Sequence, residues 1–229
     1  MLHIGIAACS AEGASLCYRT ICTEAARVTA NFTHPEITMH TPSLAEYVER
    51  LERDDWDGVA ELMLASAHKL ATAGADFLIC PDNTIHQALP TVAKRSPKPW
   101  LHIAEVVAAS AAARGFARVG VLGTRWLVAS DVYPGALAAR GIEAVRPPAH
   151  DAELVSGIIM DELVAGIARP DSIRQLQTMI DRLRETGCDA VVLGCTELPI
   201  VLDDSNSSLP TLDSTRLLAS AALHRALAG

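Results

Sequence analysis

Two residues that can exchange protons, Asp82 and Cys195, stand at equivalent positions in two similar segments of the chain. Residues 74–84 have the sequence GADFLICPDNT, and residues 187–197 have the sequence GCDAVVLGCTE. The segments align without a gap at an offset of 113 residues (187 − 74), and each holds a glycine, an aspartate, an apolar run and a polar cluster. Two related halves would then aim a carboxyl and a thiol at one ligand. This suits chemistry that needs an acid or base on each face of a carbon.

A second pair of segments extends the repeat. Residues 3–10 (HIGIAACS) resemble residues 118–125 (RVGVLGTR) at an offset of 115 (118 − 3). An insertion or deletion in one loop accounts for the small difference between the two offsets. Two pairs of segments that match in the same order at nearly the same offset predict an internal duplication.

Short apolar runs alternate with longer amphipathic stretches, which predicts an α/β fold whose mainly parallel sheets are flanked by helices. The predicted strands are Leu2–Ala7, Glu36–His40, Asp76–Cys80, Arg118–Leu122 and Asp189–Leu193, with a further strand near Trp100–Ile103. The predicted helices are Gly13–Ala30, Asp55–Ala73, Thr84–Ala93, Ala104–Arg114, Val128–Ala139, Ala152–Ile167, Asp171–Thr186 and Asp213–Ala228.

The duplication predicts two lobes. Residues 1–103 with 213–229 form the expected N-terminal lobe, and residues 104–212 form the C-terminal lobe. The boundary follows the strand after the Pro-rich turn Ser96–Pro99. The last helix is assigned to the first lobe on symmetry alone.

The composition narrows the class of protein. The chain has 229 residues, half of them hydrophobic, so it can bury a core without disulfides or metals. Its net charge of −8, from 27 acidic and 19 basic residues, argues against nucleic acid as a partner. We find no secretory signal and no apolar run of membrane-spanning length. We therefore expect a cytoplasmic protein with thiol cysteines, no membrane partner and no metal site.

Four polar clusters follow predicted strands, at the edge of the sheet where ligands of parallel α/β proteins bind. They are residues 9–10, 81–84, 123–125 and 194–197, and each is expected to be followed by a helix. Backbone N–H groups at helix N-termini suit a carboxylate ligand. The candidate substrate-binding residues in these clusters are Ser10, Asn83, Thr84, Thr124, Thr196 and Glu197.

Cys195 and Asp82 are the candidate catalytic residues. Only Cys195 among the six cysteines has a context that indicates reactivity, because a helix N-terminus lowers the pKa of a thiol. Asp82 has two interpretations that the sequence leaves open: an acid or base opposite Cys195, or the N-cap of the next helix. His86 is expected to support the site. Most of the other cysteines are expected to be small buried side chains: Cys9, Cys17, Cys22, Cys80 and Cys188.

These residues resemble the signatures of the cofactor-independent Asp/Glu racemase superfamily, which includes hydantoin racemase, maleate isomerase and arylmalonate decarboxylase. Residues 194–199 (GCTELP) match its second signature, and residues 83–86 (NTIH) match its first. The resemblance covers nearly the whole chain. It implies two pseudo-symmetric lobes with the site in the cleft between them, no cofactor, and a homodimer.

The chain departs from the family pattern at one catalytic position. A cysteine normally stands directly before the Asn-Thr pair, and here that residue is Asp82. Cys80 stands two residues earlier, about 6–7 Å away along a strand. The segment Thr41–Leu44 also lacks an arginine that some members use, and Val164 replaces a frequent lysine. These departures leave open whether the substrate carries an acidic side chain.

The resemblance implies an amino-acid racemase of the aspartate/glutamate type that works without pyridoxal phosphate. Cys195 as a thiolate would remove the α-proton of one enantiomer, and Asp82 would return a proton to the opposite face. One alternative is a single-thiol isomerase or decarboxylase of a dicarboxylate, and another is a non-catalytic amino-acid-binding protein. In each case the partner is a small amino acid or dicarboxylate.

Overall fold

A computed structural model describes residues 1–29 and 32–229, so Ala30, the predicted end of the helix that starts at Gly13, lies outside the described residues. The chain divides into two compact units. The first comprises Met1–Ile103 and Thr215–Gly229, and the second comprises Ala104–Ser214. Each unit contains one four-stranded sheet.

The sheet of the first unit has the strand order β2-β1-β3-β4, and all its strand pairs are parallel. Its inner strands β1 and β3 are completely buried, because their side chains are apolar on both faces. The strands are β1 (Ile4–Ala7), β2 (Ile37–His40), β3 (Phe77–Ile79) and β4 (Trp100–Leu101).

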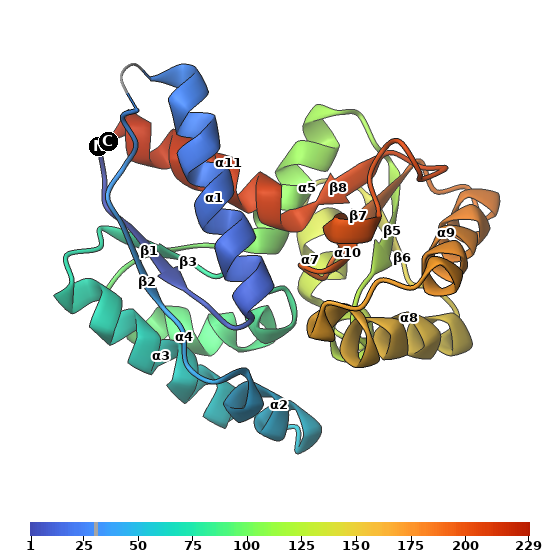
Figure 1. The fold of residues 1–229 in the computed structure, drawn as a ribbon, viewed down its shortest axis with the longest axis horizontal. Helices are drawn as coiled ribbons and strands as arrows, with labels where there is room; N and C mark the ends of the chain where they lie inside the picture. The colour runs from blue at the N-terminus through green and yellow to red at the C-terminus, as the bar shows by residue number, and fades with distance from the viewer. Residues whose placement is uncertain (30–31) are drawn as a thin grey trace. The chain divides into compact units, whose positions relative to one another are not determined.

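Helices cover both faces of this sheet, with α1 and α11 on one face and α3 and α4 on the other (Figure 1). The Ser220 hydroxyl of α11 donates a hydrogen bond of 2.6 Å to Glu24 of α1. The chain ends also meet within this unit, where the Leu2 N–H donates to the carbonyl of Ala226. The helical segments are α1 (Ala11–Val28), α2 (Leu44–Glu52), α3 (Trp56–Thr72), the 3₁₀ helix η1 (Thr84–Ala88), α4 (Leu89–Arg95) and α11 (Ser214–Ala228).

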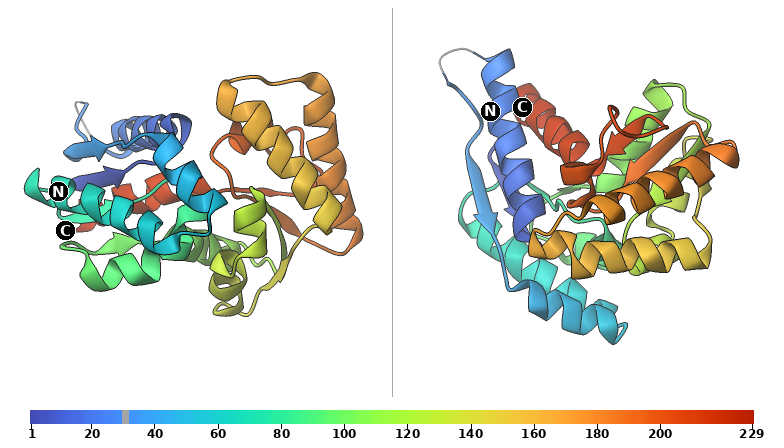
Figure 2. Two further views of the ribbon diagram at one scale, coloured as in Figure 1. Left: turned by 90° about the horizontal axis from the view of Figure 1, so that it is seen from below. Right: turned by 45° about the vertical axis from the view of Figure 1, so that its right-hand side comes forward.

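The second unit repeats the topology with the order β6-β5-β7-β8, again all parallel. Its main hydrophobic core lies where α8 and α9, side by side in Figure 2, pack on β5 and β7. The strands are β5 (Arg118–Leu122), β6 (Glu143–Val145), β7 (Ala190–Leu193) and β8 (Thr211–Asp213). The helical segments are α5 (Ile103–Ala113), α6 (Arg125–Ala129), α7 (Val132–Ala138), α8 (Ala149–Asp161), the 3₁₀ helix η2 (Leu163–Ala165), α9 (Pro170–Glu185) and α10 (Leu198–Val201).

The strand register of the two sheets reproduces both offsets of the sequence repeat. Ile4 pairs with Phe77 in the first sheet, and Val119 pairs with Ala190 in the second. The first residues of the pairs are 115 apart and the second are 113 apart.

At the start of each inner strand pair, an aspartate carboxylate accepts a backbone N–H of the neighbouring segment. Asp76 accepts the N–H of His3 at 2.8 Å, and Asp189 accepts the N–H of Ala117 at 2.7 Å. The two units are therefore copies of one α/β motif in backbone and in side-chain contacts.

The predicted α/β class with two sheets is confirmed, and the differences concern individual elements. Strands β6 and β8 and helix α2 were not predicted; both strands have only three residues. The helix expected after Cys195 is present as α10, with only four residues. The predicted helix Val128–Ala139 is interrupted at Ser130, whose hydroxyl accepts the N–H of Val132. Asp213, predicted as the first residue of the last helix, ends β8, and α11 begins one residue later at Ser214.

Candidate active site

The first polar cluster follows β1 and is held by a helix cap. The Ser10 hydroxyl accepts the N–H of Gly13 at 3.2 Å, which makes Ser10 the N-cap of α1. Side-chain caps of this kind satisfy one of the N–H groups that a helix start leaves without a backbone partner. Ser10 and its neighbour Cys9 are buried at this edge of the sheet.

Asp82 lies beyond the carboxyl end of the neighbouring strand β3 and is partly exposed. Its Oδ1 atom accepts the N–H of Ile85 at 3.0 Å, so the carboxyl caps the turn that begins η1. A carboxylate has two oxygens, so this contact is compatible with an acid–base role. Asn83 and Thr84 follow Asp82 and are both buried.

His86 supports the loop that carries Asp82. Its Nδ1 lies 2.6 Å from the carbonyl oxygen of Asp82, and its Nε2 accepts the N–H of Ile103 at 3.3 Å. Burial first, and then His102, lowers the pKa of His86 to about 3. The ring is therefore neutral at pH 7, with its proton on Nδ1 donated to Asp82. This is a positioning contact, since it uses the backbone and not the carboxyl of Asp82.

Two buried weak acids, the Cys80 thiol and the Tyr47 hydroxyl, lie near Asp82. Burial, and next the charge of Asp82, raises the pKa of the Cys80 thiol well above its usual value. Burial also raises the pKa of Tyr47, with smaller contributions from Cys80, Cys9 and Asp82. These groups stay protonated at neutral pH, so Asp82 has neutral neighbours on its buried side. Tyr47 was not predicted as a site residue, although Leu44, Tyr47 and Leu51 have helical spacing.

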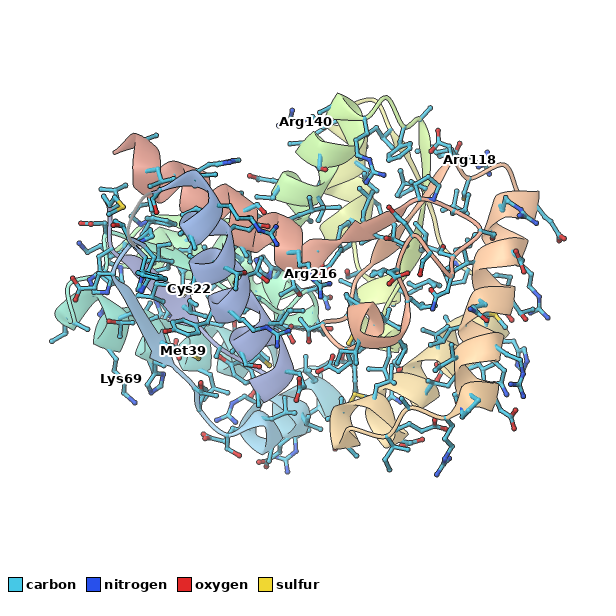
Figure 3. The ribbon with its side chains drawn as sticks, turned by 45° about the horizontal axis from the view of Figure 1, so that its top comes forward. Cys22, Met39, Lys69, Arg118, Arg140 and Arg216 are labelled. Carbon is cyan, nitrogen blue, oxygen red and sulfur yellow. The ribbon has the colours of Figure 1, made fainter. Side chains whose placement is uncertain are left out.

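A line of hydrogen bonds holds the Tyr47 hydroxyl in place. Tyr47 is hydrogen-bonded to Ser66, whose Oγ lies 3.0 Å from Nδ1 of His40. The Nζ of Lys69, an exposed residue labelled in Figure 3, lies 2.9 Å from Nε2 of the same histidine. Burial and then the charge of Lys69 lower the pKa of His40, so the neutral ring can accept from Lys69.

The second unit places its polar clusters at the same edge of its own sheet. The Thr124 hydroxyl caps α6 by accepting the N–H of Leu127 at 3.3 Å. Glycine is required at Gly194, since a Cβ there would lie 2.7 Å from the carbonyl oxygen of Leu122. The backbones after β5 and β7 therefore run close together, and they bring Thr124 and Cys195 to neighbouring positions.

Cys195 forms a compact group with the two residues that follow it. Its Sγ lies 2.8 Å from Oε2 of Glu197, and the Thr196 hydroxyl donates to the same oxygen at 2.8 Å. Thr196 and Glu197 are buried, whereas Cys195 is partly exposed. Glu197 was predicted to contact substrate, which stays a prediction; in the structure its carboxylate accepts hydrogen bonds from the Cys195 thiol and the Thr196 hydroxyl. It is placed to take the thiol proton.

The helix expected to activate Cys195 is too short to do so by its dipole. The segment after Cys195 forms only α10, four residues long, and its N-cap is Glu197. The favourable effect of a helix N-terminus on an anion needs aligned peptide units, so four residues contribute little. The Glu197 carboxylate, at 2.8 Å from Sγ, is therefore a better candidate to activate the thiol.

The part of the chain that the structure describes contains neither a group of metal ligands nor a membrane-spanning helix. Within residues 1–29 and 32–229, no three His, Cys, Asp or Glu side chains are grouped so that they could hold a metal ion. Over the same ranges, no helix is both long and apolar enough to cross a membrane.

Comparisons with known proteins agree on one family. Residues 7–222 match the family described as Asp/Glu/Hydantoin racemase. The chain is 29% identical to the broad specificity amino-acid racemase RacX of Bacillus subtilis, over 76% of this chain and 75% of that protein. A crystal structure of a candidate Asp/Glu racemase from Yersinia pestis superposes with a TM-score of 0.90 at 29% identity, covering 99% of this chain and 100% of that one. An aspartate racemase homologue from Pyrococcus horikoshii has a TM-score of 0.85 at 26% identity, with the same coverage.

Proposed function

Because the chain belongs to the Asp/Glu/hydantoin racemase family and is a racemase, an enzyme of the isomerase class, we propose that it inverts the Cα of a small amino acid without pyridoxal phosphate. Cys195 and Asp82 serve opposite faces of that carbon in this proposal. The substrate is of the aspartate/glutamate type, the enzyme acts as a homodimer, and it works in the cytoplasm.

The equivalence of Asp82 and Cys195 is the observation that carries the proposal. Both residues follow the inner strand of a duplicated sheet, and the register of that strand against its neighbour is the same in both units. Both are partly exposed, whereas the residues on either side of them are buried. Two related motifs thus present one acid–base side chain each at the edge where ligands of such sheets bind.

The chemistry requires a proton to leave one face and another to enter the opposite face. Cys195, having passed its own proton to Glu197, takes the α-proton as a thiolate. The C–H electron pair moves into the carboxylate, which becomes an ene-diolate. Asp82, protonated at that stage, then delivers its proton to the other face of Cα. The reverse sequence inverts the second enantiomer, so the products balance without an oxidant or a cofactor.

Neutral donors would stabilise the negative charge that develops on the substrate carboxylate. Asn83, Thr84 and Thr196 stand beside the two acid–base residues and are buried. The Ser10 and Thr124 hydroxyls accept from helix N–H groups, and each still carries a hydrogen that it can donate. Each donor that is preorganised around a developing oxyanion commonly lowers the activation barrier by about 3–4 kcal/mol.

Proton exchange in deuterated buffer tests this function against its alternatives. The enzyme is incubated with single enantiomers of acidic and neutral amino acids, and with dicarboxylates, while NMR follows loss of the α-proton and chiral chromatography follows inversion. We expect deuterium incorporation together with inversion for one class of amino acid. Release of CO₂ or cis–trans isomerisation of a dicarboxylate, without racemisation, would replace the proposal with the single-thiol alternative. Ligand binding without any exchange would indicate an amino-acid-binding protein.

A further inference from the structure

Cys9 stands two residues beyond β1, and Asp82 stands three residues beyond the neighbouring strand β3. In the β1–β3 pair, Ile4 faces Phe77 and Ile6 faces Ile79. If this register is continued for three residues past the last pair, Cys9 comes level with Asp82. The same continuation in the second unit, from the pair Leu122 and Leu193, brings Thr124 level with Cys195. Cys9 therefore holds the position toward Asp82 that Thr124 holds toward Cys195.

Thr124 and Cys9 stand at equivalent positions, but only Thr124 caps the helix that follows it. Thr124 is the N-cap of α6, and its hydroxyl accepts the N–H of Leu127. In the first unit the N-cap of α1 is Ser10, which stands one residue later than the equivalent of Thr124. The additional loop residue transfers the capping role away from position 9. A thiol can occupy this position because the helix start does not depend on it.

The electrostatics of Tyr47 agree with this register. Burial, and after it the charges of Cys80, Cys9 and Asp82, raise the pKa of Tyr47, so these three groups lie close enough to its hydroxyl to act on it. Cys9 is only 3% exposed, whereas Asp82 is partly exposed. Asp82 is thus the member of the group that substrate can reach, and Cys9 lies on its buried side.

We infer that Cys9 and Asp82 act as one proton-transfer pair, in which the buried Cys9 thiol donates a hydrogen bond to the Asp82 carboxylate and holds it in position to exchange a proton with Cα. Cys9 is a positioning residue, since it acts through Asp82 and does not touch the substrate. The inference deepens the proposed function and depends on Asp82 being an acid–base residue.

The proton balance of this pair is simple. When Asp82 removes the α-proton, the C–H bond breaks, its electron pair stays on the substrate, and the proton moves to a carboxylate oxygen. Cys9 keeps its own proton throughout, because a thiolate beside a carboxylate would place two anions in a buried site. In the opposite direction the Asp82 proton returns to Cα, and the Cys9 hydrogen bond stabilises the carboxylate that remains.

The first experiment measures deuterium exchange from each enantiomer separately, in the full-length enzyme. Asp82→Asn identifies which enantiomer loses its proton to Asp82. We expect Cys9→Ala to slow exchange of that enantiomer about tenfold or more, while exchange of the other enantiomer and both KM values change by less than about threefold. Cys9→Ser, which keeps a donor, should restore most of the exchange. Cys17→Ala is the matched control, since Cys17 is a buried thiol of the same unit that lies on α1.

The second experiment exchanges the two side chains. Cys9→Asp alone puts two carboxyls together and should lower racemisation, whereas Asp82→Cys alone restores the cysteine that the family normally carries at this position and should retain or raise racemisation. The double variant Cys9→Asp/Asp82→Cys restores one carboxyl and one thiol, and it should racemise at least about tenfold faster than the product of the two single effects predicts. Circular dichroism and thermal unfolding identify any variant that fails to fold.

The outcomes separate this inference from the function on which it rests. If Asp82→Asn stops racemisation but Cys9→Ala behaves like Cys17→Ala, the pairing is wrong and the proposed function stands. Additive effects in the double variant would also overturn the pairing. If Asp82→Asn racemises at the wild-type rate, Asp82 is only a helix cap; its acid–base role and the pairing with Cys9 are then both wrong, while racemase activity itself stands.

Discussion

At the scale of single residues, the contact between Cys195 and Glu197 offers a way to activate the thiol in the proposed mechanism. A carboxylate that accepts the thiol hydrogen at 2.8 Å can remove the proton, whereas a four-residue helix cannot stabilise much charge. Asp82 has no matching carboxylate in its own segment, and its neighbours include the weak acids Tyr47 and Cys80. The two faces of the substrate would therefore be served by groups of unlike chemistry.

Cys195→Ala should abolish racemisation and all exchange from the enantiomer that Cys195 deprotonates, because no other group replaces the thiolate. Cys188→Ala, a buried cysteine of the same unit, should keep turnover within about tenfold, or about 1.4 kcal/mol of barrier. Chiral chromatography measures the turnover. Iodoacetamide labelling followed by peptide mass spectrometry should modify Cys195 first and show protection by substrate. Inactivation that follows labelling of Cys80 would assign the reactive thiol elsewhere.

Asp82→Asn should stop racemisation in both directions, because the amide keeps the shape and the possible cap but cannot exchange a proton. Cys195 should still introduce deuterium into the enantiomer whose α-proton faces it, without inversion. NMR in deuterated buffer distinguishes exchange from inversion. Asp82→Ser provides a control for the cap, since serine caps helices equally well. A fully active Asp82→Ser enzyme would reduce Asp82 to a structural role.

Glu197→Gln should lower kcat about 10²-fold or more while KM changes little, since glutamine can accept a hydrogen bond but cannot take the Cys195 proton. The pH profile of exchange from the Cys195 side should move toward higher pH, because the thiol must then ionise without its base. Glu153→Gln, at an exposed glutamate of α8, is the control and should have wild-type kinetics. An unchanged pH profile in Glu197→Gln would show that Glu197 only binds or positions substrate.

At the scale of elements, the loops after the inner strands hold the candidate site residues. Each loop is held in place by its own hydrogen bonds. Ser10 and Thr124 cap the helices that follow β1 and β5. His86 ties the loop after β3 to the start of α5, through the Asp82 carbonyl on one side and the Ile103 N–H on the other. These contacts explain why η1 begins as a 3₁₀ helix before α4 continues.

The buried neutral state of His86 predicts a pH-dependent stability. Its pKa is about 3 in the folded state and about 6.5 in the unfolded state, so between these values the unfolded chain binds the additional proton. The free energy of unfolding is therefore unaffected above pH 6.5 and falls as pH decreases, by up to about 1.4 kcal/mol per pH unit.

Urea unfolding at pH 7, 6 and 5 measures this dependence. His86→Gln should be less stable at pH 7 but should lose less stability between pH 7 and pH 5 than the wild type. His68→Gln, at an exposed histidine of α3, should keep the wild-type slope. Identical slopes in all three proteins would mean that His86 does not stay neutral in the folded state.

At the scale of the whole molecule, the duplication explains why the chain has one topology twice. The order β2-β1-β3-β4 and the order β6-β5-β7-β8 are the same order with different numbers. Helix α11 follows β8 of the second sheet, yet its residues from Thr215 belong to the first unit. The C-terminal segment therefore completes the core of the unit that contains the N-terminus.

Leu223→Ala should lower the free energy of unfolding of the first unit by about 2–5 kcal/mol, because Leu223 of α11 is 1% exposed and its removal leaves a cavity. Leu227→Ala, at a position 37% exposed on the same helix, should cost less than about 1 kcal/mol. Urea unfolding followed by circular dichroism gives both values. Equal effects at the two positions would contradict the assignment of α11 to the first core.

The sequence by itself determined the repeat, the inner strands and the family. Buried strands of parallel sheets are apolar on both faces, so β1, β3, β5 and β7 were recognisable as continuous runs, each ending in a polar cluster. The edge strand β6 was missed because its three residues are all partly or fully exposed and show no such run. Cys195 and Asp82 were identified because they stand in equivalent copies of one motif.

Only the tertiary structure decided what surrounds these two residues. The direction of the Glu197 carboxylate gives the Cys195 thiol a hydrogen-bond partner that the sequence did not indicate. Tyr47 and Cys9 come from segments far from Asp82 in the sequence, and they come near it because β1 pairs with β3 and α2 packs on α3, which itself packs on β1. Hydrophobic periodicity specifies which face of an element is buried, whereas the partner of a buried polar group depends on how distant elements pack. That packing is a property of the folded chain.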